Sequence, residues 1–179
     1  MTPATESPSE RRLTGILASY GHFHRDARNR LTHYFGVPAI IYAMLIPLAL
    51  HTTTAFGGAV RLDRSLLVVA ALGYTLLDPA LGVSLTLVLA LLAAAAEATC
   101  RFGPSAAAII AGVVFVLGWA LQLLGHRLEG NRPALLTNLA QVLVAPLFLV
   151  AELGFALGLR RELAASVERR LKDASLRRG

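Results

Sequence analysis

The run AAAIIAGVVFVLGWALQLL (residues 106–124) contains no charged side chain and decides the fold class. A helix of about 20 mostly apolar residues crosses the ~30 Å hydrocarbon core of a bilayer. Further apolar runs cover residues 37–53, 65–77 and 81–98, and 55% of the 179 residues are hydrophobic. The runs are unbroken rather than alternating, which favours helices over the strands of a barrel.

These runs predict an all-α integral membrane protein, a bundle of four full transmembrane helices. Residues 65–77 are short for a crossing and pair with the next run as a helical hairpin, broken at Asp78-Pro79. A further apolar segment, residues 139–157, is interrupted by Gln141, Pro146 and Glu152. It predicts either a Pro-broken re-entrant segment or a fifth span.

The segments outside the apolar runs are polar. Residues 1–10 are rich in Pro, Ser and Thr, which predicts a disordered tail, and residues 11–20 predict an amphipathic helix on the membrane surface. Residues 125–133 form a polar loop between apolar segments, and the last twenty residues predict a basic interfacial helix. We therefore expect a single membrane catalytic domain at residues 11–158, followed by the interfacial helix at 159–179.

Basic residues flank the apolar runs and give a net charge of +6. This pattern indicates membrane topology and contact with lipid headgroups, not nucleic acid. The positive-inside rule places both termini in the cytoplasm if residues 139–157 fold back. Arg outnumbers Lys, as in many bacterial proteins, so we expect the bacterial inner membrane. Cys100 is the single cysteine, which excludes a disulfide framework.

The segment YGHFHRDARNRLTHYFGVP (Tyr20 to Pro38) places ligand-type side chains directly before the first apolar run. His24 and His33 are nine residues apart, on opposite sides of a continuous helix. Both reach one ion only if the chain bends between them. We expect that bend near Asn29, as the N-cap of a short helix that stops at Gly36-Val37-Pro38. The alternative is a set of polar side chains at headgroup level.

A second group lies at the end of the opening run. Trp119, Gln122, His126 and Glu129 step by three, four and three residues, which places them on one face if the helix continues. Gly125 permits a close approach by another backbone. The alternative is an interfacial Trp anchor beside an inter-helix hydrogen bond. An even number of crossings places this group on the same side of the membrane as the first.

Imidazole nitrogens suit Fe, Zn, Cu and Ni. Three histidines, or two with Glu129, leave open positions on Fe(II), and three histidines on Zn²⁺ can activate water. The offset between His22 and His24 points His22 elsewhere, and His51 lies at the far end of the first run. Arg25, Arg28 and Arg132 are candidates for holding a substrate carboxylate or, equally, a lipid phosphate. A Gly-rich phosphate loop, Gly-x-Ser-x-Gly and Cys-x-x-Cys are absent.

Three blocks of the chain together resemble the membrane 2-hydroxy fatty acid dioxygenase family over about residues 20 to 152. The blocks are Tyr20-x3-His24-x4-Asn29-x3-His33-x2-Gly36-x-Pro38, Trp119-x2-Gln122-x2-Gly125-His126-x2-Glu129-x3-Pro133-Ala134-Leu135, and Gln141-x4-Pro146-x-Phe148-x3-Glu152.

The resemblance implies Fe(II)-dependent α-oxidation, in which a 2-hydroxy long-chain fatty acid and O2 give a fatty acid one carbon shorter. It makes His24, His33 and His126 the expected iron ligands. Expected catalytic residues that orient ligands or contact substrate are Tyr20, Asn29, Gln122 and Glu129, and Glu129 is also a candidate ligand. A Zn-dependent membrane lipid hydrolase and a non-enzymatic small transporter or lipid-binding protein remain alternatives. The oligomeric state stays open, with a homo-oligomer among the options.

Overall fold

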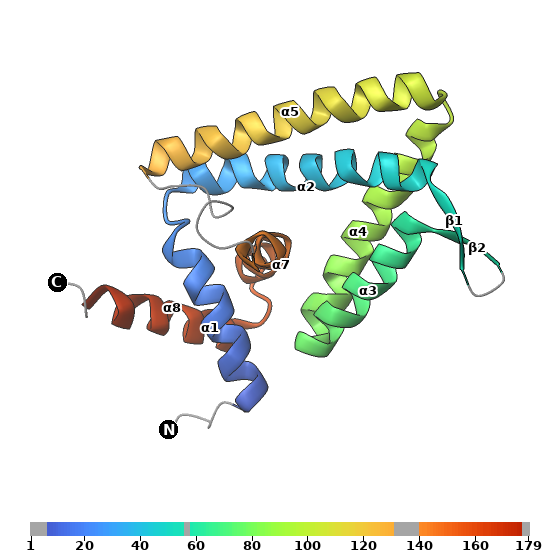
Figure 1. Ribbon diagram of the computed structural model, residues 1–179. Helices are drawn as coiled ribbons and strands as arrows, with labels where there is room; N and C mark the ends of the chain where they lie inside the picture. The colour runs from blue at the N-terminus through green and yellow to red at the C-terminus, as the bar shows by residue number, and fades with distance from the viewer. Residues whose placement is uncertain (1–6, 56–57, 131–139, 177–179) are drawn as a thin grey trace.

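The computed structural model describes residues 7–55, 58–130 and 140–176. This part of the chain contains seven helices and one two-stranded antiparallel hairpin (Figure 1), which confirms the all-α class. The elements are α1 (Pro8–His22), α2 (Ala27–Leu50), β1 (Thr52–Ala55), β2 (Gly58–Arg61), α3 (Leu62–Leu77), α4 (Pro79–Cys100), α5 (Pro104–Glu129), α7 (Ala140–Ala156) and α8 (Arg161–Leu176).

Three of the described helices, α2, α4 and α5, are long and apolar enough to cross a membrane. Helices α7 and α8 meet the same test only together, and they are bent by 115° where they join, so the count rises to four if this pair forms one span. Helix α3 has 16 residues and rises about 24 Å, less than the ~30 Å hydrocarbon core. Length therefore supports three or four spans, and it does not support α3 as one of four full crossings.

Helices α2 and α5 run antiparallel, side by side along their length (Figure 1). Glycines make this close approach possible. A Cβ on Gly118 would lie 2.8 Å from Cγ1 of Ile40, and a Cβ on Gly36 would lie 3.0 Å from the Gly118 carbonyl oxygen. Small residues at a helix crossing let two backbones approach closely and gain packing contacts.

Helix α2 differs from the short helix expected around Asn29. Its N-cap is Asp26, whose side chain accepts a hydrogen bond from the N–H of Arg28, and the helix continues through Pro38 and Pro47 to Leu50. The required bend between His24 and His33 is present, but it lies before Asp26 rather than at Asn29. The predicted stop at Gly36-Val37-Pro38 was wrong because this face of the helix packs on α5.

The expected hairpin of α3 and α4 is confirmed. Asp78 caps α4 by accepting the N–H of Leu81 at 2.9 Å. The same carboxylate holds Arg160, from the bend between α7 and α8, in two hydrogen bonds of 2.7 and 3.0 Å. This bidentate pair ties the turn of the hairpin to the C-terminal helices.

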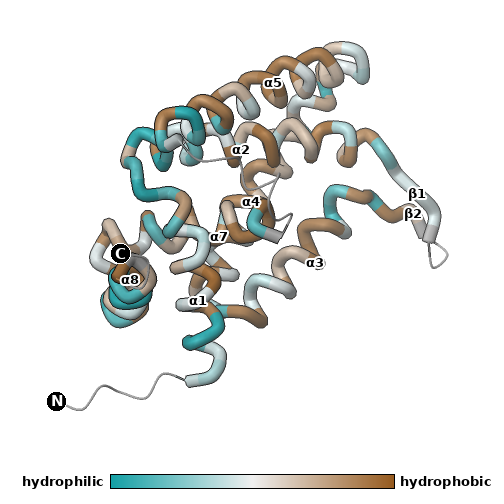
Figure 2. Tube along the Cα trace, turned by 60° about the vertical axis from the view of Figure 1, so that its left-hand side comes forward, coloured by the Kyte–Doolittle hydropathy of each residue, from teal (hydrophilic) through white to brown (hydrophobic). Residues whose placement is uncertain are grey.

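Helix α1 begins at Pro8, inside the segment expected to be a disordered tail, with Ser7 and Glu10 forming a capping box. Residues 1–6 lie outside the described residues. The buried face of α1, including Leu13 and Leu17, packs against α7 and α8 in the main core cluster. Figure 2 shows α5 as largely hydrophobic, whereas α8 and the turn between α1 and α2 carry many hydrophilic residues.

Candidate metal centre

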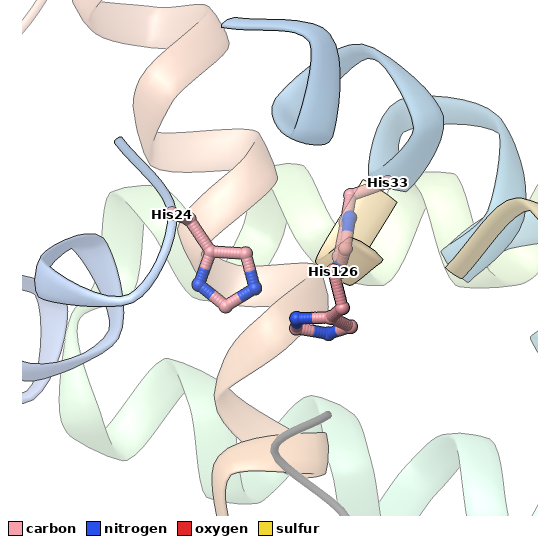
Figure 3. A group of neighbouring side chains, drawn as sticks. All are labelled: His24, His33 and His126. Carbon is pink, nitrogen blue, oxygen red and sulfur yellow. The ribbon is translucent and has the colours of Figure 1, made fainter. Parts of the chain in front are cut away.

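Three histidines from separate segments meet at one end of the α2–α5 pair (Figure 3). His24 lies in the turn after α1, His33 in the second turn of α2, and His126 in the last turn of α5. All three are buried, and one ring nitrogen from each lies within 4.8 Å of the others. The three residues expected as ligands are thus brought together, at a spacing suited to one metal ion.

Backbone carbonyls orient two of the rings. Nδ1 of His24 lies 2.9 Å from the carbonyl oxygen of Tyr20, and Nδ1 of His33 lies 2.9 Å from that of Asn29. A carbonyl only accepts, so each Nδ1 carries the proton and each Nε2 keeps its lone pair. A histidine that ligates metal usually donates its other N–H in this way. Both contacts span four residues, one helical turn.

Several buried polar atoms of the site have no partner among the described residues. They include Nε2 of His24 and Nδ1 of His126. A buried acceptor left without a hydrogen bond costs about 1–3 kcal/mol. The donor set therefore fits a metal ion, which would coordinate these nitrogens.

The aromatic ring of Tyr20 stacks on His24, with centroids 4.0 Å apart and planes inclined by 2°. The ring of Phe148, from α7, packs against the same Tyr20 ring, with centroids 4.9 Å apart. Burial lowers the pKa of His24 to about 4, so its imidazole is neutral at physiological pH. The neutral ring is the form that binds metal.

Glu129 connects the segments that carry the histidines. One of its oxygens accepts the backbone N–H groups of Arg25 and Asp26, the latter at 3.1 Å, and the other accepts the side-chain amide of Asn29. Helix α5 continues through His126 to Glu129. The first five residues of the expected polar loop, 125–129, are therefore helical. This contact fixes the turn at His24 and the start of α2 against the end of α5.

Gly125 lies where α5 is closest to the start of α2. A Cβ at this position would overlap Oγ1 of Thr32 and Oδ1 of Asn29. The expected close approach is therefore present, although side chains rather than backbone make it. Any larger residue would push His126 away from His33.

A cavity of about 130 Å³ opens beside the histidines. His33, His126, Tyr20 and Gln122 line one part of it. Trp119 also lines it, so three of the four residues expected on one face of α5 do share a face, and Glu129 lies one turn beyond. Most of the remaining wall is apolar.

Of the expected substrate arginines, Arg25 and Arg28 do not line this cavity. Arg25 is exposed and contacts Nδ1 of His22 at 2.8 Å, and Arg28 pairs with Asp26 at 2.9 Å. Arg132 lies outside the described residues. The position of the two described arginines matches their alternative role as headgroup contacts.

Two parts of the site were not singled out as site residues in the sequence. Gln141 of α7, one of the residues that interrupt the apolar segment 139–157, lines the cavity. Glu152, also on α7, instead contacts α2: it pairs with Arg30 at 3.0 Å and accepts the Tyr34 hydroxyl at 3.1 Å. The second part is an apolar stripe on α2 after His33, whose helical spacing was a usable signal.

Buried imidazoles at the end of long apolar helices define this chain as a membrane-type helical protein with a candidate metal centre. Comparison with known families gives the particular assignment. The family model described as "Mpo1-like: 2-hydroxy-palmitic acid dioxygenase Mpo1-like" matches residues 11–157. The chain belongs to this family, and the match covers all three histidines. No curated protein and no solved structure gave a significant match.

Proposed function

We propose that this protein is an Fe(II)-dependent dioxygenase that converts 2-hydroxy long-chain fatty acids to fatty acids one carbon shorter. The convergence of His24, His33 and His126 carries the proposal, because it gives a dioxygenase family member a set of metal ligands. Imidazole ligands are compatible with iron, and three of them leave positions open for substrate and O2.

The proposed reaction balances without a further reductant. The carboxyl carbon of the 2-hydroxy acid leaves as CO2, the hydroxyl-bearing carbon becomes the new carboxyl group, and one O2 is consumed with release of one water. Bound Fe(II) would supply the redox chemistry that O2 needs to react with the 2-hydroxy acid. The substrate provides all the electrons, so 2-oxoglutarate is not required.

The protein's own residues divide into three roles. Tyr20, Asn29 and Glu129 position the histidines, through the stacked ring, the carbonyl oxygens and the carboxylate described above. Gln122 lines the cavity beside the metal site and is the proposed amide contact for the carboxylate or hydroxyl of the substrate. Arg25 and Arg28 are proposed to contact lipid headgroups at the surface.

We further propose that the protein lies in a bacterial inner membrane with both termini in the cytoplasm. The turn at Asp78 holds Arg160, next to the start of α8, and α1 packs against α8. Because α1 and α8 pack side by side, the first and last helices would lie on one membrane face. The 115° bend between α7 and α8 supports a re-entrant arrangement for the C-terminal part.

The test is metal analysis of anaerobically purified protein, combined with O2 uptake on 2-hydroxypalmitate. We expect iron, O2 consumption and pentadecanoate as product. A three-histidine site can also hold zinc for hydrolysis. Zinc in the protein, with a product formed without O2, would establish that alternative, and absence of both metal and O2 uptake would leave a transport or lipid-binding role.

A further inference from the structure

One face of α2 continues from the metal site as an apolar stripe. Val37, Ile40, Ile41 and Met44 follow His33 at offsets of four, seven, eight and eleven residues, and all of them line the cavity. Residues at these offsets share one side of a helix. From His33 to Met44 the helix rises about 16 Å, eleven steps of ~1.5 Å. The cavity therefore follows α2 away from the histidines.

Helices α5 and α7 supply the other walls. Trp119 of α5 and Val142 and Ala145 of α7 line the same cavity. The polar side chains that line the cavity are those of His33, His126, Tyr20, Gln122 and Gln141. The site thus combines a polar group at the metal ligands with an apolar wall along α2, which matches the two parts of a fatty acid.

The far end of the cavity is open. Met44, the last residue of the stripe, is 53% exposed there, and Val142, on the α7 wall of the cavity, is 44% exposed. Met44 lies on α2, one of the helices apolar enough to cross a membrane, so its exposed face would meet lipid tails rather than water. The distance of about 16 Å matches the ~15 Å depth of one leaflet, half of the ~30 Å core. A chain anchored at the histidines would reach the opening with its tail in the same leaflet.

We propose that the acyl chain of the substrate enters sideways from the bilayer, lies along Val37, Ile40 and Ile41, and leaves past Met44 into lipid. This inference rests on the proposed function for the identity of the head group. It makes Met44 and Val142 the residues that set which chain lengths are accepted. Lipid tails are about as apolar as the cavity wall, so longer chains gain little affinity by filling it. The longest acyl chain that the site accepts is therefore determined by whether the chain can pass Met44 into the lipid.

The test places a large side chain at the opening. Binding is measured by displacement of a fluorescent fatty acid from the purified full chain in lipid nanodiscs, with octanoic, lauric, palmitic and lignoceric acids and their 2-hydroxy forms. The Met44→Trp variant should bind palmitic and lignoceric acids about tenfold more weakly, the effect of overfilling an apolar site. Octanoic acid ends before the opening, so its binding should be unchanged.

Two further variants make the result specific. Val113→Trp is the matched control, because Val113 is also 53% exposed on a candidate spanning helix but does not line the cavity; its chain-length profile should equal that of the parent protein. Val142→Trp tests the opposite wall and should repeat the loss for long chains, even if Met44→Trp does not fold. Equal weakening of octanoic and lignoceric acids, or the same loss in Val113→Trp, would overturn the inference.

The binding series also separates this inference from the proposed function. If the parent protein loaded with iron consumes no O2 with any 2-hydroxy acid, the dioxygenase proposal fails, and the displacement profile still decides where the chain lies. If O2 uptake occurs but Met44→Trp and Val142→Trp keep the parent's chain-length profile in both binding and uptake, the dioxygenase stands and the lateral passage is wrong.

Discussion

Replacing Glu129 with Ala would remove the acceptor that three donors share: the N–H groups of Arg25 and Asp26 and the side-chain amide of Asn29. Hydrogen bonds to a charged group contribute ~1.5–3 kcal/mol each when buried. Glu129 is half-buried and water can replace part of its contacts, so the loss of stability should be about 2–4 kcal/mol in total.

The effect on metal binding should exceed the effect on the fold. Glu129 touches the turn that carries His24 and the amide of Asn29, whose carbonyl oxygen orients His33. Removal of such an outer contact typically lowers metal affinity about 10–100-fold. The Glu129→Gln variant keeps one oxygen for the two N–H groups but cannot accept from the Asn29 amide with its own amide nitrogen. Its loss should be intermediate.

Metal affinity is measured by titrating the metal-free protein with Co²⁺, whose visible absorption reports imidazole coordination, and stability is measured by thermal unfolding in the same detergent. The control is Glu168→Ala, which removes an exposed ion pair with Lys172 on α8. An exposed pair of this kind contributes about 0–1 kcal/mol, so both readouts should stay at parent values. Parent Co²⁺ affinity in Glu129→Ala would refute the positioning role.

Three other changes test separate parts of the structure. His126→Ala should abolish both bound metal and O2 uptake while the α-helical signal in circular dichroism is retained. Gly125→Ala should destabilise the protein by at least about 1–3 kcal/mol, because its Cβ would overlap atoms of α2, whereas Gly112→Ala meets no atom within 4 Å and should be neutral or slightly stabilising in thermal unfolding. Burial raises the pKa of Asp78, but the hydrogen bonds from Arg160 and from backbone N–H groups outweigh this effect and hold that pKa below its usual range. Arg160→Met should therefore lower the stability of the protein at neutral pH and lower it much less in acid.

The outcomes that contradict these expectations are distinct. Full metal content in a triple variant of His24, His33 and His126 would remove the site assignment. Equal unfolding temperatures for the two glycine variants would show that α2 and α5 are not in contact at that position. For Asp78 the folded pKa is depressed, so its stabilisation is present above the unfolded pKa of ~3.9 and is lost as pH falls further. A constant difference between Arg160→Met and the parent down to the lowest pH would exclude this linkage.

Much of the site was predictable because helical periodicity carries it. The stripe that contains Gln122 and His126 follows from spacing alone. Its place beside His24 and His33 comes from the antiparallel packing of α5 on α2, because α3 is too short to count as one of the expected crossings. The location of the bend was not predictable in the same way. Asp26 and Asn29 are both good N-cap residues three positions apart, and no Gly or Pro stands at residues 23–26, where the chain turns.

The errors have a common physical origin in tertiary packing. Local signals read Gly36-Val37-Pro38 as a helix stop, but contact with α5 outweighs the lost hydrogen bond at Pro38. Charge alone left Arg25 and Arg28 open between a substrate carboxylate and a lipid phosphate; both are exposed and neither lines the cavity. Whether a side chain faces a cavity depends on the placement of α7, which a single sequence does not specify.

The distribution of the three histidines along the chain has a consequence for biogenesis. His24 and His33 leave the ribosome early, whereas His126 follows only after α3, α4 and nearly all of α5 have been made. Synthesis proceeds from the N-terminus at about 5–20 residues per second, so the complete ligand set exists only seconds later. Two histidines on an exposed segment hold metal weakly, and stable loading must wait until α5 docks on α2. Metal occupancy would then report the docking of α5 on α2, not merely synthesis of the two segments.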